Sequence, residues 1–208
     1  EWFDHRLRLN LTLFDIKFKN LQRSIAQEQN GSLIQRTGTA QARTKGVELE
    51  TVLIPVEGLN IRGNLGYLDA KYSDFVIDIG NGQTLDASGQ QLGLTSKWTG
   101  GVSADYRLAL PGNGIGGFDA VTLYAAANGR SRYNSSQVNA PLGKQKGYVS
   151  ADASITFSTP DDRLAFQVYV NNAFDKRWIE LTNDLVGLTQ FVQDNMGRLW
   201  AASATLKF

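Results

Sequence analysis

The chain has 208 residues, with 21 lysines and arginines against 20 aspartates and glutamates, one histidine and no cysteine. The balanced charge gives no indication of a nucleic-acid partner, and the lack of cysteine excludes disulfides, thiolate metal sites and cysteine nucleophiles. The longest aliphatic stretch, around residues 120–127, is far shorter than the roughly 18–20 apolar residues of a membrane helix. A helical membrane protein is thereby excluded, whereas a transmembrane β-barrel is not, because alternating strands dilute the hydropathy signal.

Alternation of apolar and polar residues, the mark of a β-strand with one apolar face, recurs along the whole chain. It begins at Leu7, Leu9, Leu11 and Leu13, and the pattern shifts near Phe14, where we predict a β-bulge. Further strands are predicted at about 47–53, 59–67, 98–110, 121–128, 149–157, 164–171 and 200–208. The sequence therefore predicts an all-β chain of about eight strands, with no helical segment.

Short and long connections alternate between these predicted strands. The short ones, rich in Gly, Pro and Asp, fall at 55–58, 111–117 and 158–162. The long, polar ones fall at about 28–42, 79–92, 130–147 and 183–196. In an antiparallel meander this places all tight turns at one end and all long loops at the other, as in outer-membrane barrels.

The chain ends on a strand with an aromatic last residue, whereas the termini of soluble domains usually fray into water. This ending resembles the last strand of bacterial outer-membrane barrels, in which the assembly machinery reads a terminal aromatic. On that resemblance, Trp200, Leu206 and Phe208 form an assembly signal. Aromatic residues near other strand ends are typical of an interfacial girdle.

Several segments, in order, resemble the barrel of a TonB-dependent outer-membrane receptor. The N-terminal segment 2–14 is similar to one of its strands, and residues 42–50 match its Gly-x-Glu-x-Glu segment. Residues 59–75 look like the next strand, and residues 168–178 contain an Asn-x-Phe-Asp-Lys pattern like that of the penultimate strand. With the closing Leu206-Lys207-Phe208, the resemblance covers essentially the whole chain.

The resemblance implies an antiparallel transmembrane β-barrel meander that forms part of the wall of a larger barrel of about 22 strands. Residues 1–208 are then the C-terminal portion of the barrel, without the plug domain and without the TonB box. The family implies energy-driven import of a ferric siderophore or a similar scarce nutrient across the bacterial outer membrane. Its implied partners are outer-membrane lipid and lipopolysaccharide, the ligand, the TonB system through the absent N-terminal part, and the barrel assembly machinery.

Two groups of residues are candidates for site roles. Arg130, Arg132 and Tyr133 lie where a strand enters a long loop, with Lys144 and Lys146 opposite, and could bind an anionic iron chelate. A solvated loop, or contact with lipopolysaccharide phosphates, explains the same residues. Charged residues in mid-strand are predicted to line the lumen as a ladder of ionic contacts, or to touch the absent plug; these are Glu48, Glu50, Arg62, Asp105 and Arg107.

Catalysis finds little support in the sequence. His5 is the only histidine, and no serine lies in a nucleophile motif. The glycine-rich segment 112–117 is not followed by a helix, so we expect a turn rather than a phosphate-binding loop. No segment has the spacing of a calcium loop. We expect no enzyme activity, no metal site and no cofactor.

Three other interpretations stay open. A small closed barrel of eight strands with a structural or adhesive role needs a packed interior. An outer-membrane hydrolase needs paired acids or a histidine on the lumen face. A soluble β-sandwich also shows inward apolar alternation, and in that case Val102, Val168 and Leu206 would pack together in a dry core.

Overall fold

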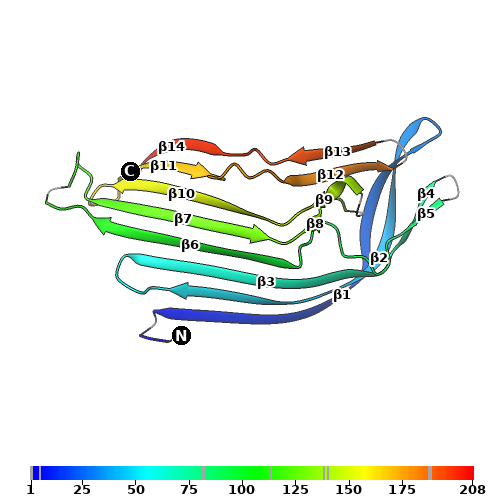
Figure 1. Ribbon diagram of the computed structural model, residues 1–208, viewed down its shortest axis with the longest axis horizontal. Helices are drawn as coiled ribbons and strands as arrows, with labels where there is room; N and C mark the ends of the chain where they lie inside the picture. The colour runs from blue at the N-terminus through cyan, green and yellow to red at the C-terminus, as the bar shows by residue number, and fades with distance from the viewer. Residues whose placement is uncertain are drawn as a thin grey trace.

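The computed structural model is a curved wall of mainly antiparallel strands, with short connections at one end and, at the other, loops together with the long hairpin that residues 7–53 form (Figure 1). It describes residues 2–4, 6–80, 83–112, 114–137, 139, 141–186 and 189–208. His5 lies outside the described residues. Among the described residues, no helix has the length and the apolar character needed to cross a membrane.

The main sheet of the described chain has ten strands in the order β13-β12-β1-β2-β3-β6-β7-β10-β11-β14. Its bounds are β1 Leu7–Gln29, β2 Ser32–Leu53, β3 Leu59–Asp74, β6 Trp98–Ala109, β7 Ala120–Arg130, β10 Tyr148–Ser158, β11 Leu164–Asn171, β12 Ile179–Val186, β13 Thr189–Asp194 and β14 Leu199–Leu206. Two small pairs stand apart, β4 Val76–Gly80 with β5 Gln83–Asp86, and β8 Tyr133–Asn134 with β9 Lys144–Gln145. A pass is one crossing of the wall from end to end. β11 and β12 are two parts of one interrupted pass, and β13 and β14 are two parts of another. Counted in this way, the wall has the eight passes that the sequence predicts.

The strand register carries the predicted apolar face across the whole wall. Leu11 lies opposite Leu49, and Leu49 lies opposite Leu65. The same row continues through Gly100 and Gly129. Since directly paired residues point to the same side of a sheet, the apolar positions of successive strands form one continuous surface.

This apolar surface is exposed, which is the arrangement expected of a wall that faces lipid. Val102, Val168 and Leu206 are 52%, 42% and 56% exposed, respectively, so they do not pack together in a dry core. The soluble sandwich is therefore wrong. The interpretation that requires an apolar outer face and a polar inner face is confirmed.

The predicted bulge near Phe14 is wrong in position. Pairing between β1 and β2 is continuous through Phe14 and Phe18, and the bulge lies between Phe18 and Leu21. The change at Phe14 is in which face carries the apolar residues. Up to Leu13 the outer face is apolar, and from Asp15 onward the same face carries polar side chains. The shift in the sequence pattern marks the upper limit of the apolar band, not a change in strand register.

Two of the four predicted long loops are strands. Residues 28–42 belong mainly to β1 and β2, which are joined by the two-residue turn Asn30-Gly31, both with positive φ (52° and 77°). Such a turn fits the twist of a hairpin and favours this residue pair. Residues 183–196 likewise fall largely in β12 and β13. These segments are rich in polar residues, and apolar residues stand next to each other in them, as Leu33 and Ile34 or Phe191 and Val192 do, so they lack the alternation from which a strand is predicted.

The main apolar core lies on the inner side of the wall at the long-loop end, where the β4–β5 hairpin packs against the inner face of β1, β2 and β3. Tyr72 and Phe75 are its largest side chains, with ring centroids 4.8 Å apart. The other buried members are Ile25, Ala40, Ala42, Ala70, Ile77, Ala87 and Leu92. This core fixes the connection that follows β3, which forms one side of the cavity described below.

The wall is partly closed at the same end. Ala26 and Gln27 of β1 pair in parallel with Leu185 and Val186 of β12, and Figure 1 shows β1 and β2 bending toward β12. A part of a larger barrel wall, which is what the sequence resemblance implies, would leave both edges of the sheet open, and this pairing instead closes the edge of β1 at these residues. Below them, the edges of β1 and β14 are not paired with each other in the described chain.

Candidate ligand site

The segment after β7 is anchored by Tyr133, whose side chain is 7% exposed. Its hydroxyl donates a 2.6 Å hydrogen bond to the carbonyl oxygen of Ile179 in β12. The guanidinium of Arg130 lies 3.8 Å from the centre of the Tyr133 ring, which is cation–π geometry. Burial raises the pKa of Tyr133 to about 12, so the phenol stays neutral and keeps its proton for the hydrogen bond.

Arg130 connects this anchor to the loop before β6. Its Nε donates to the hydroxyl of Ser96 at 2.9 Å, and Nη2 donates to the carbonyl of Leu94 at 3.1 Å. These bonds and the Tyr133 ring occupy the guanidinium. Arg130 is therefore held in a structural network that orders two neighbouring loops.

Buried hydroxyls hold the same segment against β12. Ser135 and Thr182, both almost fully buried, share a 2.7 Å hydrogen bond between their side-chain oxygens. The amide of Thr182 donates to the carbonyl of Ser135 at 3.0 Å. The amide of Ile179 donates to Oε1 of Gln145 at 2.8 Å. Because these polar groups are paired with each other, the loop is fixed rather than merely covering the end of the wall.

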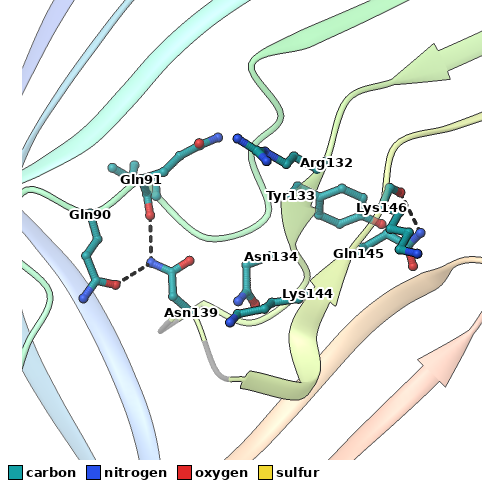
Figure 2. A pocket seen from close by; sticks show the side chains of 10 residues that line it. Gln90, Gln91, Arg132, Tyr133, Asn134, Asn139, Lys144, Gln145 and Lys146 are labelled. Carbon is teal, nitrogen blue, oxygen red and sulfur yellow. Dashed lines mark hydrogen bonds between the residues drawn. The ribbon is translucent and has the colours of Figure 1, made fainter.

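A cavity of about 570 Å³ lies between this segment and the loop before β6 (Figure 2). Four of the five predicted ligand residues line it, namely Arg132, Tyr133, Lys144 and Lys146. Arg130 does not line it and lies behind the Tyr133 ring. The structure thus brings the predicted group together from both sides of one long loop.

The cavity is strongly cationic. None of Arg132, Lys144 and Lys146 makes an ion pair within the described residues. Three positive charges that share one concave site without a carboxylate attract a negatively charged ligand. Figure 2 shows Arg132 on the Gln91 side of the cavity and Lys144 on the Asn139 side.

Amide side chains complete the lining, and sequence reasoning missed them. They are Gln90, Gln91, Asn134, Asn139 and Gln145, and Leu92 lies beside them. Asn139 Nδ2 donates to Oε1 of Gln90 at 3.1 Å and to the carbonyl of Gln91 at 2.8 Å, which joins the two loops across the cavity. No spacing in the sequence predicts that these amides belong to one site. The sequence indicates only that all of them fall in two of the predicted long loops.

All of the predicted lumen residues lie on the polar face, but they form little of the predicted ladder. Arg62 pairs with Asp105 at 2.6 Å, and Asp105 also accepts a 2.8 Å hydrogen bond from Asn60. Arg107 instead binds Asp162 in the tight turn at 3.1 Å. Glu48 and Glu50 make no ion pair in the part of the chain that the structure describes. The described wall therefore holds one ionic contact between members of the ladder.

The predicted assembly signal lies on the apolar outer face, with Leu206 and Phe208 near the tight-turn end and Trp200 at the opposite end of β14. Trp200 and Leu206 belong to β14 and share the outward face with Val168 and Leu164 of β11. They are 65% and 56% exposed, and the terminal Phe208 is fully exposed. Their exposure keeps them accessible to a binding partner, and their signalling role stays a prediction.

The described residues contain no group of three or more His, Asp or Glu side chains placed to hold a metal ion. Together, the exposed apolar belt, the polar inner face and the cationic cavity at the long-loop end define a wall of an outer-membrane receptor barrel. Comparison with known proteins identifies the family. The sequence matches the family "TonB dependent receptor-like, beta-barrel" over residues 1–173, so the chain belongs to the TonB-dependent receptors, outer-membrane barrels of Gram-negative bacteria.

Solved structures share the fold. The ferric yersiniabactin uptake receptor FyuA from Yersinia pestis superposes with a TM-score of 0.74 at 19% identity, covering 98% of this chain and 28% of that one. The ferric citrate transporter FecA gives 0.70 at 16% identity, with 99% and 29% covered. The siderophore receptor PiuA from Acinetobacter baumannii gives 0.67 at 18% identity, with 98% and 26% covered. The chain thus spans under a third of the length of these receptors.

Proposed function

We propose that residues 1–208 are the C-terminal portion of the barrel of a TonB-dependent transporter that imports a ferric siderophore or a similar scarce nutrient. The family is one of receptors and not of enzymes, and the solved structures with the same fold carry names of iron-chelate receptors and transporters. We further propose that the plug and the TonB-binding segment belong to a part of the receptor other than these residues. The chain itself then carries no catalytic activity.

The observation that supports this function best is the cationic cavity at the long-loop end. Its volume of about 570 Å³ falls in the range of small-molecule sites, and its cations have no carboxylate partner among the residues that the structure describes. Siderophore-type iron chelates are compact and often anionic, so arginine, lysine and amide donors suit their outer oxygen atoms. In an intact barrel the remaining wall and the plug would contribute further contacts.

The experiment is uptake of radiolabelled ferric chelates by cells that lack or carry the complete receptor as its gene encodes it. The double variant Arg132→Gln, Lys144→Gln is expected to raise the KM for uptake. A matched control is Arg6→Gln, Arg163→Gln, which removes the same charge at the tight-turn end. Equal uptake with and without the receptor, over a panel of chelates, would contradict the proposed function.

The proposed partners follow from the same placement. They are outer-membrane lipid and lipopolysaccharide around the wall, a small ligand in the cavity, TonB through the remainder of the receptor, and the barrel assembly machinery at Phe208. The alternative is a small closed barrel of eight strands with a structural or adhesive role, which the parallel pairing of β1 with β12 favours. Residues 1–208 produced alone would then run as a monodisperse, heat-modifiable monomer in detergent.

A further inference from the structure

A row of three positive charges crosses the outer face of the wall just above its apolar band. Lys17 of β1 lies directly opposite Arg43 of β2, and Arg43 lies directly opposite Lys71 of β3. Like charges in directly opposed positions of a sheet are destabilising unless something compensates them. A bound group with negative charge would therefore stabilise this row.

The register shows that this row faces the membrane side. Counting in steps of two, Lys17 is on the same face as Leu13, and Lys71 is on the same face as Tyr67, with pairing uninterrupted between them. Leu13 is 72% exposed and belongs to the uppermost apolar row, which continues through Val47 and Tyr67. The cations thus continue the lipid-facing surface and do not line the lumen.

The height of the row corresponds to the headgroup layer. Lys17 is four residues beyond Leu13, which is about 14 Å along the strand. At the tilt typical of such barrels, this becomes roughly 10 Å along the membrane normal. Lysine and arginine side chains also extend by several ångströms toward an interface, so their charged ends can reach the polar layer next to the acyl chains.

The carboxylates that lie between the apolar row and the row of cations do not fully neutralise the cations. Asp15 pairs with Arg43, while Asp69 is shared by Lys71 at 3.4 Å and Lys45 at 3.8 Å. Lys17 makes no ion pair among the described residues. Two carboxylates serve three cations, and the fourth has none, so this outer patch carries a net positive charge at headgroup height.

We infer that Lys17, Arg43 and Lys71 form a binding site for the phosphate of an outer-leaflet lipid whose headgroup carries phosphate monoesters next to its acyl chains. The acyl chains would lie along the apolar row of Leu13, Val47 and Tyr67, and the phosphate oxygens would accept charge-assisted hydrogen bonds from the cations above. The inference rests on the membrane placement of the wall and is independent of the imported ligand.

The test measures lipid that stays bound to the complete receptor, purified from outer membranes and washed in detergent. Lipid phosphate and intact lipid mass are determined by native mass spectrometry. The variant Lys17→Gln, Lys71→Gln is expected to retain about fivefold less lipid for each lysine removed. The variant Lys17→Arg, Lys71→Arg is expected to retain as much lipid as the wild type, because it keeps both charges.

The matched control Arg6→Gln, Arg163→Gln removes the same charge at the other end of the wall and is expected to keep its lipid. Heat-modifiability on a gel confirms that each variant is folded. The inference is overturned if the glutamine variant of the row retains wild-type lipid, if the control loses as much, or if the retained phosphate has no acyl chains attached. Because the readout does not use transport, such a failure leaves the import proposal standing.

Discussion

Tyr133 and Ile179 are joined by a 2.6 Å hydrogen bond that fixes the segment after β7 to the start of β12. The bond links two passes of the wall that are not neighbours in the main sheet. It also holds the Tyr133 ring between Arg130 and the cavity. The position of the Tyr133 ring in the lining of the candidate site therefore depends on this hydrogen bond.

Removing that hydroxyl is expected to weaken the protein. In Tyr133→Phe, the Ile179 carbonyl loses its donor in a partly buried position, and such a loss is expected to cost about 1 kcal/mol, up to about 3 kcal/mol for a fully buried group. Denaturant unfolding of the receptor refolded in lipid vesicles measures the change in the free energy of unfolding. Tyr106→Phe is the control, because Tyr106 lies on the exposed outer face. Equal effects of the two substitutions would show that the hydrogen bond contributes nothing specific.

The two faces of β11 offer a second prediction. Val168 points outward from the wall, and its neighbour Gln167 points to the polar face, where it donates to Ser154 at 3.2 Å. An arginine on the lipid side of a barrel destabilises it by about 2–4 kcal/mol near the membrane midplane. Val168→Arg is therefore expected to lower the free energy of unfolding in vesicles by that order, and Gln167→Arg by much less. The reverse order would place lipid on the other face.

The sequence predicts the spanning part of the wall well for a physical reason. Water on one side and lipid on the other impose a strict alternation of polar and apolar side chains along each strand. Apolar residues such as Val102, Leu123 and Ile155 therefore indicate both where the strands lie and which face is shared. The polar residues that alternate with them are predicted equally well to lie on the opposite face. Where this contrast is present, strand number and orientation follow from the pattern alone.

Outside the membrane the contrast disappears, and so does the signal. Residues 28–42 form paired strands with polar residues on both faces, so they read as a loop. The cavity shows the same limit: Arg132 and Lys144 are recognisable as charges, whereas Asn139 and Gln91 become part of a site only through the folding of two loops toward each other. Such contacts between distant segments leave no period or spacing in the sequence.

The charge of the cavity gives a third prediction, on affinity. Because Arg132, Lys144 and Lys146 have no ion pair in the described part of the chain, binding of an anionic ferric chelate to the purified receptor should weaken as salt rises. The triple glutamine variant should lose most of that salt dependence, because its attraction no longer comes from charge. Titration calorimetry at two ionic strengths measures both effects. A wild-type affinity that is insensitive to salt would contradict a role for these charges.

The tight turn after β10 gives a prediction on pH. A hydrogen bond from Arg107, together with the positive charge of its guanidinium, lowers the pKa of Asp162 below its ordinary value. A carboxyl whose pKa is lowered by folding adds stability above its unfolded pKa, near 3.9, and that contribution is lost as the pH falls through the folded value. Asp162→Asn should therefore destabilise the receptor at pH 6, and its cost should shrink toward pH 3. Unfolding midpoints at the two pH values test this, with Glu57→Gln in the tight turn between β2 and β3 as the control. A cost that stays constant between the two pH values would mean that Asp162 contributes through packing and not through its charge.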